Sequence, residues 1–193
     1  MGAAPVLRLS VAEYLELDRK AEVRSEYHDG EMFPMEASSV AHSRIDVRVG
    51  AALLDQLQGS RCEVLSASLR VRVSPTKYLI PDLMVVCGKL QLTDEHQDTV
   101  TNPKVIFEIL SPSSEAYDQG TKFRLYSLLE SFEEYVLVFQ DRPRVVVYRK
   151  TSDTRWILTI YKGLEGAFAL ESLGITIPMS KIYDGVELTE PVD

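Results

Sequence analysis

Two apolar segments of this chain each contain a carboxylate at a position where a buried strand normally has none. The first is YLIPDLMVVC, residues 78–87, which contains Asp82, and the second is VIFEILSPSS, residues 105–114, which contains Glu108. An acid within an apolar strand costs free energy unless a partner, a proton or a metal ion offsets its charge. The fold must therefore offset the charges of these two acids, and the rest of the chain is interpreted as the scaffold around them.

The length and composition indicate one globular domain. Of the 193 residues, 45% are hydrophobic and 26% are charged, which excludes disordered and fibrous proteins. No apolar run reaches the roughly 18–20 residues that a membrane-spanning helix needs, and the N-terminal segment MGAAPVLRLSVAEYLE becomes acidic too early for a secretory signal. We therefore expect a single domain over residues 1–193 that is cytoplasmic and has no membrane partner.

The hydrophobic patterns predict a mixture of helices and strands. The expected elements, in chain order, are a helix over 11–18, a hairpin within 24–36, a helix from Ser38 or Ser39 to about Gln58, strands over 62–67, 68–74 and 78–88, a strand over 105–110, a helix after Ser113 or Ser114, and strands over 133–139, 144–150 and 155–161. This order predicts an α/β fold with one mixed central β-sheet flanked by helices. Residues 10–36 would form an N-terminal helix and hairpin, residues 38–161 the core, and residues 162–193 a segment that wraps back onto the sheet.

Local signals set several of these boundaries. A capping box beginning at Ser10 starts the first helix, the dipeptide Asp29-Gly30 is a hairpin turn signal, and Gly59 ends the second helix. Pro81 has no backbone donor, so the strand around it should be irregular or begin again there.

Three residues that are not candidate site residues have simpler structural expectations. Period-two alternation in residues 68–74 places Arg70 on the polar side of a half-exposed strand. Cys62 and Cys87 have no second Cys or His at metal spacing, so they are interpreted as buried reduced thiols and zinc is not expected.

Two predicted helices carry polar residues within their apolar stripes. His42 lies near the start of the second helix, and a stripe on the third helix contains Asp118, Lys122 and Tyr126. A histidine in such a stripe is more often a hydrogen-bonded packing residue than a ligand, and both interpretations of His42 stay open.

Asp82 and Glu108 are hard oxygen ligands of the kind that Mg²⁺ or Mn²⁺ prefers. If their strands are neighbours, the two acids can meet at one end of the sheet. A cation there would polarise a phosphoryl oxygen and activate a bound water, and Lys122 could position that water or stabilise the developing charge. The sequence therefore favours a metal-dependent phosphodiester chemistry.

Each of these residues also has a structural alternative. Asp82 can be a turn residue after Pro81, and Glu108 can belong to a buried ion pair. Asp118 and Lys122 are four residues apart on a helix, where an ordinary surface pair is common. The net charge of −8 also argues against a protein that coats nucleic acid, because such binding depends on Lys and Arg neutralising phosphates.

The combination of motifs resembles a known superfamily. The elements that match are Pro81-Asp82, Glu108 within VIFEILSPSS, Asp118, Lys122 and Tyr126, with EYHDGEMFPM and His42 as a further N-terminal match. Together they resemble the PD-(D/E)XK nucleases and, within them, the Uma-two group of restriction-endonuclease-like proteins. The resemblance extends from Ser10 to about Lys150.

This resemblance implies a restriction-endonuclease-like fold, use of Mg²⁺ or Mn²⁺, and hydrolysis of nucleic acid, with DNA as the expected substrate. Asp82 and Glu108 take the roles of the motif acids and bind the metal. The motif lysine is replaced by Leu110, so Lys122 is the expected substitute from the next helix.

Two further residues could complete the predicted site. Glu26 on the hairpin would supply an additional N-terminal acid, and His42 is another candidate. The competing hypothesis, motivated by Leu110 and the acidic net charge, is a catalytically silent binding or assembly module on the same fold.

We also expect self-association as a homodimer. The apolar segment RWILTIY favours an exposed sheet edge that a second copy could cover. The sequence is silent on DNA versus RNA, on strandedness and on sequence preference.

Overall fold

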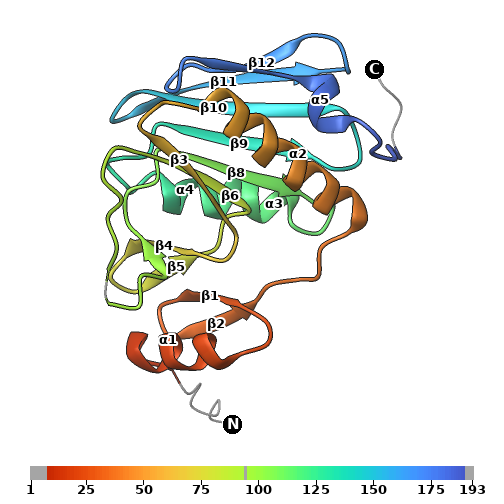
Figure 1. Ribbon diagram of the computed structural model, residues 1–193. Coiled ribbons are helices and arrows are strands. Elements are labelled where there is room, and N and C mark those ends of the chain that lie inside the picture. Colours follow the sequence, from red (N-terminus) through yellow and green to blue (C-terminus); the bar gives the residue numbers. More distant parts are fainter. Residues whose placement is uncertain (1–7, 94, 190–193) are drawn as a thin grey trace.

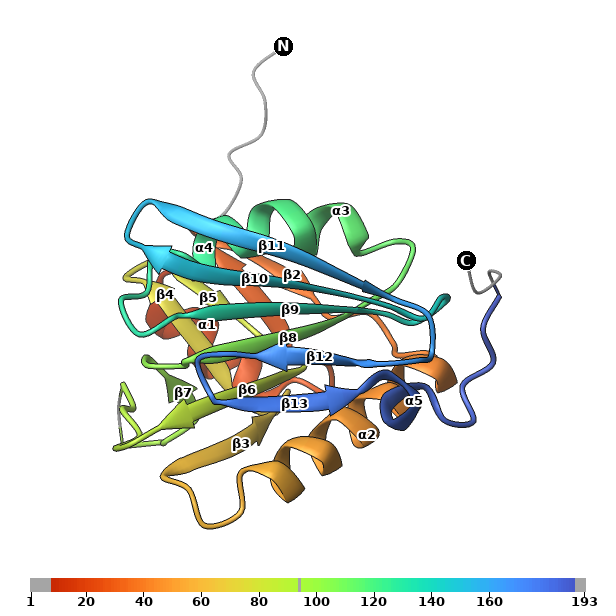
Figure 2. The same cartoon turned by 90° about the horizontal axis from the view of Figure 1, so that it is seen from above.

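A six-stranded mixed sheet forms the centre of the protein. The computed structural model describes residues 8–93 and 95–189. The strands lie in the order β11 (Arg155–Lys162), β10 (Arg144–Ser152), β9 (Glu134–Phe139), β8 (Val105–Leu110), β6 (Leu83–Cys87) and β3 (Cys62–Ser66). Only the β8–β9 pair within this sheet is parallel, and the others are antiparallel. Figure 2 shows these strands side by side, with β11 and β3 at opposite edges. The predicted mixed central sheet is confirmed.

A smaller sheet and the first helix form a separate layer (Figure 1). Its strand order is β2 (Glu31–Pro34), β1 (Ser25–His28), β5 (Lys77–Leu79), β4 (Arg70–Ser74) and β7 (Thr99–Val100), and α1 (Val11–Lys20) lies beside it. The apolar run predicted as one strand is divided at Pro81, because β5 belongs to the small sheet and β6 to the large one. The irregularity expected at the proline is therefore a change of sheet.

Each face of the large sheet has its own hydrophobic core. One face packs against α2 (Val40–Gln56), α5 (Met179–Tyr183) and the hairpin of β12 (Ala167–Leu170) and β13 (Ile175–Pro178). The other face packs against residues of the small sheet and of the segment around α4 (Phe123–Tyr126). Because alternate strand residues point to opposite faces, Ile106 and Leu110 place Glu108 on the second face.

Several local predictions are confirmed by backbone geometry. Ser10 forms both hydrogen bonds of the capping box with Glu13. Asp29 and Gly30 have φ values of 49° and 105°, the positive angles that a tight hairpin turn requires. Ser39 accepts a hydrogen bond from the His42 backbone and begins α2, which ends at Gln56, two residues before the predicted end.

The predicted third helix is irregular. It consists of α3 (Glu115–Tyr117), a π-helical turn (Asp118–Lys122) and α4, rather than one continuous α-helix. The wider turn holds both Asp118 and Lys122 in buried positions. π-Helical turns of this kind are often found at functional sites.

Two structural expectations are wrong. Cys62 and Cys87 are not reduced thiols but form a disulfide, because they lie directly opposite each other in the β3–β6 pair with Cα atoms 4.0 Å apart. Arg70 is not half-exposed: only 1% of its surface is accessible, because two aspartates from outside its strand neutralise it.

No helix within residues 8–93 and 95–189 is long and apolar enough to cross a membrane. Part of the N-terminal segment examined for a signal, and the ends of the predicted single domain, lie outside the described residues.

Candidate active site

Glu108 is buried at the centre of β8 and is paired with a lysine. The side chain of Glu108 is 2% exposed and that of Lys122 5%. The Lys122 Nζ donates to Glu108 Oε2 at 2.9 Å, and the Tyr126 hydroxyl donates to Glu108 Oε1 at 2.9 Å. Both oxygens of the buried acid are therefore hydrogen-bonded, which explains how an apolar strand accommodates it.

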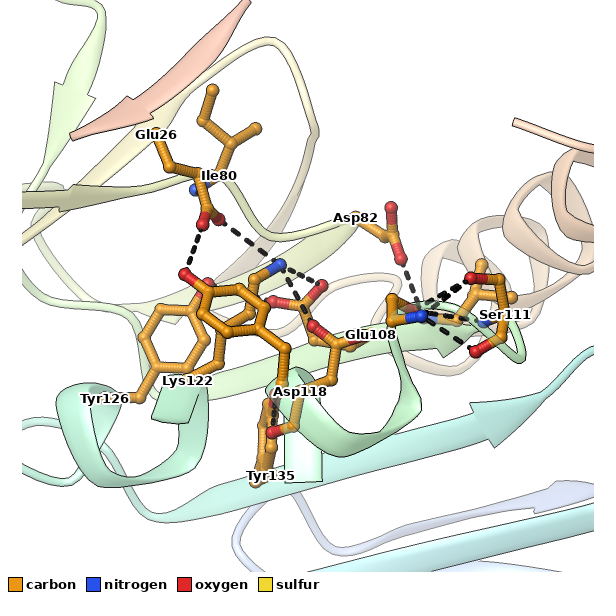
Figure 3. Close-up of polar contacts among 12 residues, drawn as sticks. Glu26, Ile80, Asp82, Glu108, Ser111, Asp118, Lys122, Tyr126 and Tyr135 are labelled. Carbon is orange, nitrogen blue, oxygen red and sulfur yellow. Dashed lines mark hydrogen bonds and ion pairs between the residues drawn. The ribbon is translucent and has the colours of Figure 1, made fainter. Parts of the chain in front are cut away.

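Lys122 contacts two more carboxylates. Its Nζ lies 3.3 Å from Glu26 Oε1 and 3.4 Å from Asp118 Oδ1. Figure 3 shows Glu26, Glu108 and Asp118 arranged around the lysine amine. The three acids come from the small sheet, the large sheet and the π-helical turn, so this cluster joins the two layers of the fold.

Sequence reasoning missed two members of this network. The Tyr117 hydroxyl donates to Glu26 Oε2 at 2.6 Å and lies 3.0 Å from His28 Nε2. His28 is two residues after Glu26 on β1, so the period of a strand could have placed the two on the same face. No comparable signal marked Tyr117, which is in the irregular helical segment.

Asp82 occupies a different part of the site. It follows the break at Pro81, and its Oδ2 accepts a hydrogen bond from the Ile109 backbone at 2.7 Å. The same oxygen lies 3.2 Å from His42 Nε2. Asp82 is thereby held against β8 beside Glu108, on the side away from the Lys122 amine (Figure 3).

One cavity of about 630 Å³ brings most of the predicted residues together. Its lining includes Glu26, His42, Asp82, Glu108, Asp118 and Lys122. Tyr126, the remaining predicted residue, is fully buried behind Glu108 and is not part of the lining. Asp82, Glu108 and Lys122 thus converge on one cavity, as the predicted metal-dependent chemistry requires.

Charge is unevenly distributed in this cavity. Burial raises the pKa of Glu108 well above its usual range; Lys122 opposes this shift, but the neighbouring carboxylates reinforce it. Burial would lower the pKa of Lys122, yet the carboxylates of Glu108, Glu26 and Asp118 raise it well above its usual range. The three carboxylates thus favour the ammonium form of Lys122, and they outnumber this amine three to one.

The pKa values of Asp118, Glu26 and His42 shift in directions that depend on their surroundings. Burial also raises the pKa of Asp118 despite its contact with Lys122. Burial alone would raise the pKa of Glu26 as well. The charge of Lys122 and the hydrogen bonds that Glu26 accepts outweigh it and lower the pKa of Glu26 to about 2. Burial favours the neutral form of His42, while its hydrogen bond to Asp82 raises the pKa of the imidazole.

The donor set fits a hard divalent cation. Asp82 and Glu108 line the same cavity. Each oxygen of Glu108 accepts one hydrogen bond and keeps a second lone pair, and the two contacts described for Asp82 are both on Oδ2. A nearby buried oxygen, Asp46 Oδ1, has no hydrogen-bond partner. In the described part of the chain, no three His, Cys, Asp or Glu residues are close enough to hold an ion by themselves.

A second buried cluster of charge lies outside the cavity. Arg70 Nε donates to Asp18 Oδ2 at 2.9 Å, and Arg70 Nη1 lies 2.9 Å from Asp98 Oδ2. Arg24 and Arg19 complete the cluster, with contacts of 2.9 Å to Asp18 and 2.7 Å to Asp98. None of these residues lines the cavity. The cluster holds α1 against the small sheet. It contains three arginines and two aspartates, so the acids do not outnumber the cations.

Comparison with known proteins finds a matching family, two similar sequences and a similar solved structure. Residues 11–180 match the model of the family described as "Uma2: Putative restriction endonuclease". Two uncharacterized proteins of Synechocystis sp., slr1290 and sll1609, are 32% and 33% identical over 95% and 84% of this chain, and 96% and 93% of their own lengths. A crystal structure from Anabaena variabilis, described as "a putative nuclease belonging to DUF820", superposes with a TM-score of 0.73 at 17% identity, covering 91% of this chain and 97% of the other. The fold is the restriction-endonuclease-like α/β fold.

Proposed function

Because the chain belongs to the Uma2 family, we propose that it is a divalent-metal-dependent nuclease that hydrolyses phosphodiester bonds of nucleic acid. The observation that carries this proposal is the shared cavity of Asp82, Glu108 and Lys122. Three residues from distant parts of the chain meet there, and the acids outnumber the available ammonium groups.

Asp82 and Glu108 would hold Mg²⁺ or Mn²⁺ through their carboxylate oxygens. Such an ion, when bound, polarises a phosphoryl oxygen and lowers the pKa of a coordinated water. His42 orients Asp82 through their 3.2 Å contact, and Tyr126 orients Glu108.

Lys122 acts as a hydrogen-bond donor and not as a general base. Its raised pKa keeps the amine protonated, so it cannot accept a proton from the attacking water. As an ammonium it can orient that water or stabilise charge on the phosphoryl oxygens. It reaches the cavity from the π-helical turn, which supports the view that it replaces the lysine lost at Leu110.

A catalytically silent module on the same fold is the alternative. This alternative would be favoured if Lys122 faced solvent or paired only with Asp118. Lys122 is instead 5% exposed and its amine donates to Glu108, so its position supports the nuclease.

The experiment is cleavage of single- and double-stranded DNA and RNA with Mg²⁺ or Mn²⁺, using the wild type and Glu108→Gln. We expect Glu108→Gln to lose at least about a hundredfold in rate, the scale of one lost transition-state interaction. Glu134→Gln is the matched control, because Glu134 is also a buried glutamate of the same sheet but lies outside the cavity. If the folded wild type cleaves no substrate with either metal, the proposal fails and the silent module stands.

We further propose that two copies associate through β11. Ile157, Leu158 and Ile160 on this edge strand are 47%, 49% and 45% exposed. Successive residues of a strand point to opposite faces, so both faces of β11 expose apolar side chains. The Gly163 backbone donates to Pro143, so by alternation Leu158 and Ile160 direct their backbone groups away from β10.

Light scattering tests the association through β11. The wild type should have the mass of a dimer at micromolar concentration, and Ile160→Lys should have that of a monomer. Leu128→Lys, at another exposed apolar residue, should stay dimeric. A monomeric wild type would contradict the proposal.

A further inference from the structure

The cavity is walled on one side by exposed apolar residues. Phe33 of β2 lines it together with Pro34 and Met35, and 46% of the Phe33 surface is accessible. The ring lies edge-to-face with His28, with centroids 5.3 Å apart and planes at 83°. An exposed aromatic ring held in a fixed orientation is a stacking surface for a nucleobase.

The connection between β2 and α2 lines the cavity. Figure 1 shows this connection as a single extended segment running from the small sheet to the start of α2. It is attached to the far side of the cavity twice: Ser113 Oγ donates to Glu36 Oε2 at 3.0 Å, and Ser39 Oγ donates to Gln140 Oε1 at 2.6 Å. These two hydrogen bonds hold the connection across residues that line the cavity.

The cavity lacks the charges that a duplex requires. Lys122 is the single Lys or Arg among the described lining residues, and its amine already contacts three carboxylates. Binding several successive phosphates, of a duplex or of a single strand, depends on Lys or Arg residues that neutralise them, so this cavity suits a single nucleotide. The rim instead offers neutral hydroxyl groups, which contact phosphates through hydrogen bonds without adding positive charge. The serines that line it are Ser38, Ser39, Ser111, Ser113 and Ser114.

The depth of the acids leads to the same conclusion. Because Glu108 and Lys122 are 2% and 5% exposed, a scissile phosphate must pass into the cavity to reach them. A paired nucleotide cannot leave the duplex surface without unstacking, whereas an unpaired nucleotide can rotate into a pocket. The volume of about 630 Å³ is that of a small-molecule site and suits one nucleotide.

We propose that the cavity binds an unpaired nucleotide of a single strand, with its base stacked on Phe33, and does not bind an intact duplex. This inference rests on the proposed nuclease function, whose metal site lies in the same cavity. It assigns Phe33 to substrate binding and narrows the substrate to single strands, flaps or frayed ends.

The test measures binding separately from cleavage. Fluorescence anisotropy with Ca²⁺ in place of Mg²⁺ compares a labelled single-stranded oligonucleotide with a blunt duplex of the same sequence. We expect the single strand to bind at least about tenfold more tightly, and Phe33→Ala to weaken it by about 5- to 150-fold, the range for loss of one stacked base. Phe33→Tyr keeps the ring and should bind like the wild type, and Val23→Ala, at an exposed apolar residue outside the cavity, should have no effect.

Each result has a definite meaning. Equal affinity for both nucleic acids, binding of neither, or unchanged single-strand binding in Phe33→Ala would overturn the inference even if the protein cleaves DNA. Tight, Phe33-dependent binding of single strands without cleavage under Mg²⁺ or Mn²⁺ would support the inference and reject the proposed function.

Discussion

The two buried clusters of charge in this protein differ in their balance and in their access to solvent. Around Arg70, three arginines face Asp18 and Asp98, and no member reaches the cavity. Around Lys122, three carboxylates face one ammonium, and the cavity opens onto them. In a cluster without surplus acids, which we call complete, each carboxylate has an arginine partner, and removing that arginine leaves the carboxylate buried and unpaired. A cluster with surplus carboxylates beside a cavity is incomplete until it binds protons or a cation.

The largest expected effect is on the complete cluster. Arg70→Met leaves Asp18 buried without its main partner, so the free energy of unfolding should fall by about 3–5 kcal/mol. Chemical denaturation measures this loss. Arg72→Met, at an exposed arginine on the same strand, should change stability by less than about 0.5 kcal/mol. Equal losses in the two variants would show that the Arg70 cluster does not stabilise the fold.

The corresponding change in the incomplete cluster should cost less. Lys122→Met removes the only ammonium, but Glu108 and Asp118 can take up protons through the cavity. We expect a loss of about 1–3 kcal/mol at neutral pH that shrinks on acidification. Lys104→Met, at a partly exposed surface pair, serves as the control. A loss as large as that of Arg70→Met, and independent of pH, would contradict the distinction between the clusters.

The pH dependence of stability should come from the incomplete cluster. Because burial raises the pKa of Glu108, the folded protein holds a proton that the unfolded chain releases above about pH 4.3. Its contribution to stability is therefore complete below that pH and is lost as the pH rises through the folded pKa, by at most about 1.4 kcal/mol per pH unit. Metal-free denaturation curves between about pH 4 and 8 should show this slope in the wild type. In Glu108→Gln the slope should be smaller, and an unchanged slope would assign it elsewhere.

The smallest expected effect is stabilisation by the metal ion. At Mg²⁺ five times above its dissociation constant, the unfolding free energy should rise by about 1 kcal/mol. Thermal unfolding with and without Mg²⁺ measures the increment. Arg70→Met should retain it because its cluster is outside the cavity, and Asp82→Asn should lose most of it. Retention in Asp82→Asn would remove Asp82 from the metal site.

The sequence predicted those features that depend on local chemistry. The turn at Asp29-Gly30 and the cap at Ser39 follow from side-chain and backbone preferences of a few residues. Glu108 was recognisable because no other residue of its strand is polar. Its lysine partner could be anticipated from the family motif, although its placement depends on a π-helical turn that residue spacing does not indicate.

Features that depend on long-range pairing were not predictable. The alternation of β4 distinguishes Arg70 from Val71, but it does not show that Asp18, 52 residues away, will cover that face. The Cys62–Cys87 disulfide requires the register of β3 against β6, which neither strand specifies alone. The same limit hid Tyr117, which contacts Glu26 only when the two layers are assembled. His28 is on the same strand as Glu26, so its place beside Glu26 could have been inferred from the strand period.

The break at Pro81 has a mechanical consequence for the site. Ile80 donates its backbone N–H to Glu26 Oε1 at 3.1 Å in the small sheet, while Asp82 accepts from Ile109 at 2.7 Å in the large one. Three consecutive residues thus tie both layers to the carboxylates of the cavity. A separation of the layers would pull Glu26 away from Glu108, because Asp82 is held to the large sheet through Ile109 whereas Glu26 is not. Substrate must accordingly be admitted without opening the two layers, and the β2–α2 connection is the element whose displacement would leave the acids in place.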